Sequence, residues 1–275
     1  MNMTYKIAIN ALLASAFCLA ISSCQKMERP PLGDYEKDTN PPGGPLKFYA
    51  AFDERSVDSI RANFGVDNNV TFEDGVSGKA ISNGYVVFPS ANDFKTVSSF
   101  TVAFWLKRAG PNPAGGGTAF AFGLSSTSGI WTQQDMFLLF EDAGNPSSAD
   151  SAAAKFYVND QWFEFVGVKR LPKVLDGQWH HLAFVFDETT SMLTTYLDGQ
   201  AYTNLPPNFG KFNNNGGQVD FSKIGGIVVG APGHYAVGKT PDGWMGNFNG
   251  SIDQFRMYGV ALSAAEVASL FTNKE

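Results

Sequence analysis

The sequence predicts an all-β sandwich that ends in one short helix. From residue 47 onward, short runs rich in β-branched and aromatic residues recur, each bounded by Gly, Asn, Asp or Pro, which is the pattern of strands and turns. Several runs, such as Leu182–Phe186, are apolar on both faces, which indicates stacked sheets that bury both sides of a central strand. Strands do not alternate with helical patterns, so a Rossmann or (β/α)8 architecture is disfavoured.

Composition supports a folded head and limits its partners. Of the 275 residues, 44% are apolar and 24 are Phe, which suits a packed core and excludes a disordered chain. The net charge is −6, from 20 Lys and Arg against 26 Asp and Glu, and the basic residues are not clustered. Because phosphate binding needs a basic face, nucleic acid is not an expected partner, and neither is electrostatic adhesion to acidic lipid.

Residues 1–23 are predicted to be a lipoprotein signal peptide. The apolar run over residues 7–21 follows one cation, Lys6, and is shorter than the roughly 20 apolar residues of a spanning helix. It ends in Ile-Ser-Ser-Cys, which resembles a bacterial lipobox with Cys24 as the lipidated first residue of the mature chain. An uncleaved anchor helix and a secreted form cleaved nearby are the alternatives.

Residues 24–46 are predicted to be the lipidated cysteine and a proline-rich tether. Residues 25–46 contain five prolines and three glycines, a composition that stays extended and holds a head away from a membrane. Lys26 and Glu28 partly resemble the surface-export signal of Bacteroides-group lipoproteins, although Met27 interrupts the pattern. We expect a bacterial envelope location, lipid-anchored in the outer membrane, with the leaflet left open.

The cysteine count agrees with this division. The chain has only Cys18 and Cys24, and both precede the predicted head. The head over residues 47–275 therefore has no thiol, so its core must supply its stability, and its length is sufficient for one.

Eight strands are expected in the head, at Ser99–Lys107, Phe137–Phe140, Lys155–Val158, Phe163–Val168, His180–Phe186, Leu193–Leu197, Ile224–Val229 and Ser251–Tyr258. Asp198-Gly199 predicts a tight hairpin turn, and Asp176-Gly177 predicts a second one. Long polar loops at residues 108–118, 142–154 and 208–220 are either binding loops or decoration.

One helix is expected at the C-terminal end. Ser263 and Glu266 form a capping-box pattern, in which each side chain satisfies the other residue's backbone N–H. Val267, Leu270 and Phe271 then share one helical face. We expect a helix of two or three turns that packs on the edge of the sandwich.

Four segments of the head carry a family resemblance. They are Phe48–Asp53; residues 75–81 with 84–89 and 100–107; residues 176–187 with 196–199; and residues 248–258 with 261–267. In this order they resemble the laminin-G-like jelly-roll domains of the concanavalin A-like lectin/glucanase superfamily. The resemblance implies a two-sheet antiparallel jelly roll over residues 47–275. It does not imply one function, because the family includes glycan-binding modules, adhesion modules and accessory domains of enzymes.

Catalytic patterns are weak. Glycoside hydrolysis generally uses two carboxylates about 5–10 Å apart, and the Glu-x-Asp-x-(x)-Glu strand of the glucanase branch does not occur here. Asp160 and Glu164 form the best acid pair, with a solvated turn acid and an exposed strand acid as the alternative. The Gly-x-Ser-x-Gly pattern does not occur either. We therefore expect a protein that is not an enzyme and has no catalytic residues.

A structural calcium ion is the one metal that the resemblance suggests. Asp53 and Asp253 lie in the first and last family segments, and both would meet at one sheet edge if those strands pair. Related jelly rolls often hold calcium at such an edge, and calcium prefers oxygen ligands. The alternative is that both acids cap turns. We expect no other cofactor.

Aromatic residues beside turns are the candidates for sugar binding. Trp131, Trp162, Trp244 and Tyr235 each lie next to turn residues, whereas Trp105 and Trp179 lie inside predicted strands and should be core. Flat aromatic faces bind the C–H faces of sugars, although packing at a loop rim is the alternative role.

The expected function is therefore an envelope-anchored, non-catalytic, lectin-like lipoprotein. Its partner would be a glycan or another cell-surface molecule, and it would contact the membrane only through its lipid. An adhesion or protein-interaction module of the same fold is one alternative. A glycoside hydrolase with an atypical acid pair is the other.

Overall fold

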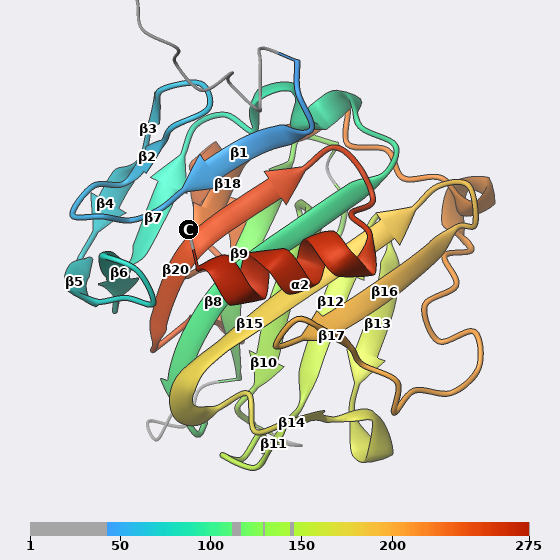
Figure 1. The fold of residues 1–275 in the computed structure, drawn as a ribbon. Helices are drawn as coiled ribbons and strands as arrows, with labels where there is room; N and C mark the ends of the chain where they lie inside the picture. Colours follow the sequence, from blue (N-terminus) through green and yellow to red (C-terminus); the bar gives the residue numbers. More distant parts are fainter. Residues whose placement is uncertain (1–42, 112–116, 129, 144–145, 275) are drawn as a thin grey trace, which may run out of the picture. The chain divides into compact units, whose positions relative to one another are not determined.

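Two antiparallel sheets stack face to face in the computed structural model, which describes residues 43–111, 117–128, 130–143 and 146–274 (Figure 1). The first sheet runs in the order β17 (Gln200–Ala201), β16 (Met192–Leu197), β15 (Asp176–Asp187), β8 (Phe100–Ala109), β20 (Ser251–Tyr258), β1 (Leu46–Ala50), β2 (Val57–Asp58) and β3 (Asn63–Phe64). Strand β6 (Lys79–Ser82) also pairs with β20, and β5 (Thr71–Asp74) pairs with β6. The predicted signal peptide, Cys24 and nearly all of the tether lie outside the described residues.

The second sheet runs in the order β13 (Gln161–Phe165), β12 (Ala154–Val158), β10 (Gln134–Glu141), β9 (Thr118–Ser126), β18 (Ile224–Val229), β7 (Tyr85–Phe88) and β4 (Val66–Asn68). The short strand β19 (Met245–Asn247) lies parallel to β9. Strands β11 (Ser151–Ala152) and β14 (Leu171–Pro172) form a separate two-stranded ribbon. The described residues also contain four 3-10 helices: η1 (Asn92–Thr96), η2 (Gly167–Lys169), η3 (Asn214–Gly217) and η4 (Gly233–Val237).

The predicted all-β sandwich is confirmed, and it is consistent with a jelly roll. The predicted strands at residues 224–229 and 251–258 coincide with β18 and β20. The strand predicted over residues 163–168 ends instead at Phe165, because Gly167 takes a φ of 61° and begins η2. Strand β9 was not predicted. All of its residues are buried, so its sequence lacks the alternation that marks a half-exposed strand.

One of the two predicted turns is confirmed. Asp198 and Gly199 have φ angles of 50° and 74° and join β16 to β17, as a tight hairpin turn requires. The turn predicted at Asp176-Gly177 is wrong, because both residues belong to β15. Gly177, with a φ of 88°, lies where the pairing of β15 with β8 shifts register. The left-handed glycine therefore makes a bulge here and does not reverse the chain.

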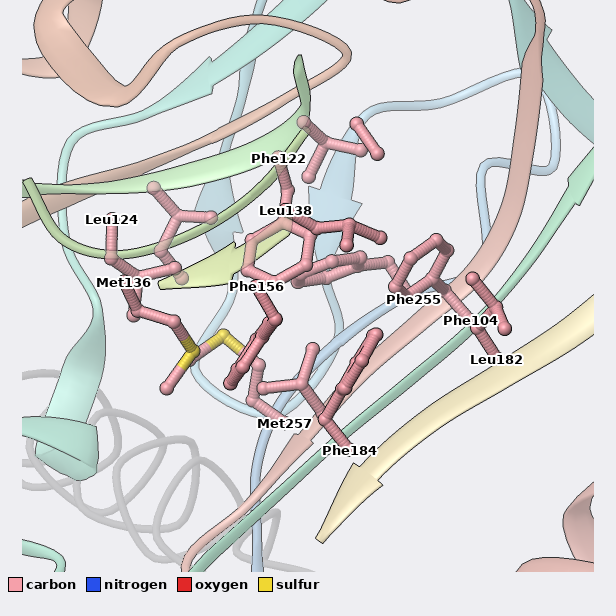
Figure 2. Close-up of a cluster of buried hydrophobic side chains, with 14 of the residues drawn as sticks. Phe104, Phe122, Leu124, Met136, Leu138, Phe156, Leu182, Phe184, Phe255 and Met257 are labelled. Carbon is pink, nitrogen blue, oxygen red and sulfur yellow. The ribbon is translucent and has the colours of Figure 1, made fainter. Parts of the chain in front are cut away.

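The core lies between the two sheets and is built largely from aromatic rings. Figure 2 shows its centre, where Phe104, Leu182, Phe184, Phe255 and Met257 of the first sheet meet Phe122, Leu124, Met136, Leu138 and Phe156 of the second. The Phe156 and Phe184 rings stack across the interface with centroids 4.3 Å apart. Full burial of each such side chain contributes about 1.5–3 kcal/mol, which stabilises a head without disulfides.

Helix α2 (Ala264–Asn273) begins with the predicted capping box. The Ser263 hydroxyl accepts a hydrogen bond from the Glu266 backbone N–H, and Glu266 accepts one from the Ser263 N–H. The helix lies across the outer face of the first sheet (Figure 1), so its predicted place at the edge is wrong. Val267 packs among outward-facing residues of β8, β15 and β16. These strands are apolar on both faces, and the helix keeps their outer face from water.

No helix in the described ranges is long and apolar enough to span a membrane.

Candidate functional site

The outer face of the second sheet carries an apolar cluster of its own. Because side chains alternate along a strand, Phe137 and Leu139 of β10 point away from the core while Met136 and Leu138 point into it. Tyr157 of β12 lies directly opposite Phe137, and the two rings stack with centroids 4.6 Å apart. Helix α2 packs against the first sheet, so other residues cover this apolar cluster of the second sheet.

Three tryptophans cover this cluster. Trp131 precedes β10, Trp162 is in β13 and Trp244 precedes β19. The Trp131 ring centroid lies 6.1 Å from that of Trp244 and 6.4 Å from that of Trp162. Trp162 and Trp244 are half-buried against Phe137 and Phe120, whereas Trp131 is 66% exposed. An exposed indole beside other aromatic rings makes this surface a candidate binding site.

The three indoles and the sheet beneath them form a hollow of about 490 Å³, which we call the aromatic groove. Its lining comprises Gly117, Thr118, Trp131, Leu139, Glu141, Ala143, Lys155, Trp162 and Trp244. All three tryptophans were predicted as candidates from the sequence, and the structure brings them together. Glu141 and Lys155 were not predicted, because their place in the groove depends on the pairing of β10, β12 and β13.

The polar side of the aromatic groove is an ion-paired triplet. Lys155 Nζ lies 2.8 Å from Glu141 Oε1 and 3.2 Å from Glu164 Oε1. Burial alone would lower the pKa of Lys155, but its hydrogen bonds to the two glutamates raise it, so the lysine stays charged at neutral pH. The ammonium also lies 5.8 Å from the centre of the Trp162 ring. The triplet places hydrogen-bonding groups beside flat aromatic faces.

Asp160 and Glu164, the best acid pair in the sequence, have different partners. Asp160 lies in the turn between β12 and β13 and accepts a hydrogen bond of 2.6 Å from the Tyr157 hydroxyl. Glu164 pairs with Lys155. The two acids that share one partner are Glu141, which lines the groove, and Glu164, which pairs with the same lysine from β13.

Tyr235 does not join the aromatic groove. Its ring stacks on Tyr85 at 4.5 Å, and neither residue lines the groove. Trp105 is core, as predicted, and stacks under Phe271 of α2. Trp179 was also predicted to be core but is only partly buried, with the Lys107 ammonium 5.0 Å from its ring. It belongs to the bulged end of β15, where the strand leaves its regular register.

A second hollow of about 490 Å³, which we call the acidic pocket, lies at the other end of β10. Its lining comprises Ser128, Ile130, Asp135, Asn159, Asp160, Asn214, Asn215, Asp220 and Lys223. Only Asp160 and the polar loop over residues 208–220 stood out in the sequence. Asp135 gave no signal, because it precedes the strand predicted at Phe137–Phe140 and lies where the pairing of β10 with β9 shifts register.

Asp53 and Asp253 meet at one loop, and the condition for their meeting, a pairing of the first and last strands, is fulfilled. Strand β1 pairs with β20. Asp253 accepts a hydrogen bond of 2.7 Å from the Val76 N–H, and Asp53 accepts one of 2.7 Å from the Lys79 N–H. A Cβ on Gly75 would collide with Asp253, so glycine is what allows this approach.

The surroundings of Asp53 and Asp253 have some of the properties of a calcium site. Burial raises the pKa of Asp253 to about 7, and its Oδ1 is buried with no hydrogen-bond partner. An orphaned carboxylate oxygen beside a second carboxylate fits a hard cation. The described residues nowhere bring together three His, Cys, Asp or Glu side chains placed to hold a metal. Calcium here would therefore also need backbone carbonyl or water ligands.

Comparison with known sequences identifies the family. The sequence profile of the concanavalin A-like lectin/glucanases superfamily matches residues 80–268, which is more than half of the chain. The chain belongs to this superfamily. No curated protein sequence matches it.

Solved structures of the superfamily's fold resemble the chain at low identity. Domain 4 of AbnA, a GH43 extracellular arabinanase from Geobacillus stearothermophilus solved with arabinotriose, is 19% identical with a TM-score of 0.53, covering 83% of this chain and 98% of that one. The binding domain of Paraclostridial Mosquitocidal Protein 1 is 17% identical with a TM-score of 0.55, covering 84% and 52%. Trypanosoma rangeli sialidase in complex with sialic acid is 14% identical with a TM-score of 0.53, covering 84% and 32%. At these identities the likeness concerns the fold.

Proposed function

We propose that this protein is an envelope-anchored, non-catalytic carbohydrate-binding lipoprotein whose binding site is the aromatic groove. The observation that carries the proposal is the convergence of Trp131, Trp162 and Trp244 over one hollow of the second sheet. Indole faces pack against the C–H faces of a sugar, and the adjacent ion-paired triplet can exchange hydrogen bonds with its hydroxyls. The likeness to an arabinanase domain solved with arabinotriose supports this choice of ligand.

The anchoring part of the proposal rests on the sequence. Cys24 would carry the lipid, and residues 25–46 would act as an extended spacer between membrane and head. In this arrangement the protein holds a glycan close to the envelope without contacting the bilayer through the sandwich itself.

A structural calcium ion between Asp53 and Asp253 is also proposed. Its support is the buried Oδ1 of Asp253, which has no partner, and the glycine loop that both carboxylates approach. The ion would join the first and last strands of the head and would take no part in sugar binding, because these acids do not line the aromatic groove.

Binding of immobilised and soluble glycans by purified protein tests the main proposal. Trp131→Ala should weaken binding about two- to tenfold, because a stacked ring contributes about 0.5–1.5 kcal/mol and about 1.4 kcal/mol corresponds to a factor of ten. The matched control is Trp179→Ala, which removes a partly buried tryptophan from the first sheet. Equal affinities of wild type and Trp131→Ala would contradict the proposal. Capture of a protein without dependence on sugar would favour the adhesion alternative.

The hydrolase alternative keeps one specific observation in its favour, which is that Glu141 and Glu164 both pair with Lys155, a residue that lines the groove. If the protein is a hydrolase, it should release products from polysaccharides, and Glu164→Gln or Glu141→Gln should abolish the release. The proposal expects no product from wild type under conditions in which it binds the same polysaccharide.

A further inference from the structure

The acidic pocket and the aromatic groove lie at different points along strand β10. Phe137 and Leu139 belong to the outer cluster of the second sheet, whereas Asp135 lies at the start of the strand, where its pairing with β9 shifts register. Asp135 lines the pocket and Leu139 lines the groove. The two residues are four positions apart, which corresponds to about 13 Å at 3.3 Å per residue. This distance exceeds one sugar ring, so a ligand that reached both hollows would be an oligosaccharide.

The two hollows are lined by neighbouring residues. Ile130 lines the pocket, and the next residue, Trp131, lines the groove. On the other side, the Tyr157 hydroxyl donates to Asp160 in the pocket, while the Tyr157 ring lies 5.1 Å from that of Trp162 in the groove. The row formed by Phe137, Tyr157 and Trp162 across three strands is therefore the boundary between the hollows.

Asp135 lines the pocket, and one of its carboxylate oxygens lacks a hydrogen-bond donor. It is 4% exposed, and its Oδ2 is buried with no hydrogen-bond partner. Burial raises the pKa of Asp135 to about 6, and the charges of Asp220 and Asp160 act in the same direction. A buried acceptor without a donor destabilises the free protein. A ligand that supplies the donor recovers this free energy on binding.

Charge defines the kind of ligand. Asp135, Asp160 and Asp220 outnumber Lys223 in the pocket, and beside the groove Lys155 is paired with two acids, Glu141 and Glu164. The charged groups of the two hollows therefore sum to a negative charge at neutral pH, which disfavours a carboxylated or sulfated ligand. The open volume of about 490 Å³ suits an organic ligand of sugar size.

We infer that the acidic pocket is a second subsite for the same glycan, in which Asp135 accepts hydrogen bonds from the hydroxyl or amino groups of a neutral or amino sugar. This inference rests on the proposed function, and it assigns the ligand class. The glycan lies across the Trp131 edge, with one end in the groove and the other in the pocket. Uronic acid and sulfated glycans are rejected.

Titration calorimetry on the full head with a panel of oligosaccharides tests the inference. The panel holds the dimer and hexamer of arabinan, xylan, cellulose and chitin, together with the chitosan hexamer and the galacturonic acid hexamer. For each neutral series that binds, Asp135→Asn and Asp220→Asn should weaken the hexamer at least fivefold and leave the dimer unchanged. Trp131→Ala should weaken both lengths. Wild type should bind the galacturonate hexamer at least tenfold more weakly than a neutral hexamer.

The variants are matched so that each outcome is decisive. Asp220 is exposed, so Asp220→Asn remains informative if Asp135→Asn fails to fold. Asp67→Asn removes an exposed acid from the opposite edge strand β4 and should change nothing. Unchanged hexamer affinity in Asp220→Asn and Asp135→Asn, or equal binding of galacturonate, would overturn the subsite while leaving the groove intact. Wild type that binds no member of the panel would overturn the proposed function as well.

A cation site is the competing outcome. Calcium added to chelator-treated protein would then bind with a heat that Asp135→Asn and Asp220→Asn remove but Asp253→Asn leaves in place. That result would overturn the sugar subsite in favour of a metal.

Discussion

The indole rings of Trp131 and Trp244 lie nearly parallel, with 12° between their planes and 6.1 Å between their centroids. Trp131 comes from the turn before β10, and Trp244 comes from the turn before β19, in the second half of the chain. Strand β19 reaches this place by its parallel pairing with β9. The groove between these indoles therefore depends on a pairing of distant segments and not on a local motif.

We expect the two tryptophans to differ in what they contribute. Trp131→Ala should leave the free energy of unfolding within about 0.5 kcal/mol of wild type, because the ring is mostly exposed. Trp244→Ala should cost about 1–3 kcal/mol, since its ring packs against Phe120. Urea unfolding followed by far-UV circular dichroism measures both. Equal destabilisation by the two changes would show that Trp131 is a packing residue.

Removal of calcium should lower the thermal stability of the head if Asp253 and Asp53 hold the ion. A ligand present at 100 times its Kd adds about 2.7 kcal/mol, so chelation should lower the Tm by about 5–10 °C, and added calcium should restore it. Asp253→Asn should show neither effect, whereas Asp67→Asn should behave like wild type. No heat on calcium addition, together with an unchanged Tm, would leave both aspartates as turn-binding acids.

The pKa values of the adjacent histidines of β15, His180 and His181, should be shifted in opposite directions. Hydrogen bonds to Asp198 and Asp176, at 2.9 and 3.1 Å, raise the pKa of His180 above its ordinary value of 6.5. Burial against Trp105 lowers the pKa of His181 to about 4. NMR titration of the two imidazoles should therefore give one midpoint above 6.5 and one well below it. Two midpoints near 6.5 would contradict both assignments.

These shifts have opposite effects on stability. His180 stabilises the fold in full below pH 6.5, and this contribution disappears as the pH rises through its folded pKa. The His181 contribution is present above pH 6.5 and decreases as the pH falls toward 4. His180→Gln should therefore remove the loss of stability on the alkaline side of pH 6.5 and keep the loss on the acid side. Urea unfolding between pH 4 and 9 tests this, and an unchanged alkaline limb would contradict it.

Replacing only one partner of the ion pair between Arg108 and Asp142 should lower the free energy of unfolding of the head. Arg108 Nη2 lies 2.6 Å from Asp142 Oδ2, and both side chains are buried. Arg108→Met leaves a buried carboxylate without its partner, so it should destabilise the head by about 3–5 kcal/mol. The double variant with Asp142→Leu should recover most of that loss. Chemical unfolding of both variants measures it, and a small effect of the single change would mean that water reaches Asp142.

Much of the architecture could be read from local patterns. The capping box at Ser263, the hairpin at Asp198-Gly199 and strands β18 and β20 depend on residues that are near neighbours in sequence, so their prediction was correct. Strand β9 and the bulge at Gly177 could not be predicted in this way. Burial on both faces removes the alternation of a strand, and a left-handed glycine serves a bulge as well as it serves a turn.

Local patterns were enough to predict the sandwich, its C-terminal helix, its family and the candidates Trp131, Trp162 and Trp244, because side-chain alternation and turn residues act over a few positions. Long-range packing was needed to show that these indoles share one groove, that Lys155 joins Glu141 to Glu164 and that Tyr235 lies elsewhere. Strand register across the sheet sets these relationships, and register is fixed by the burial of the whole core, which no short stretch of sequence contains.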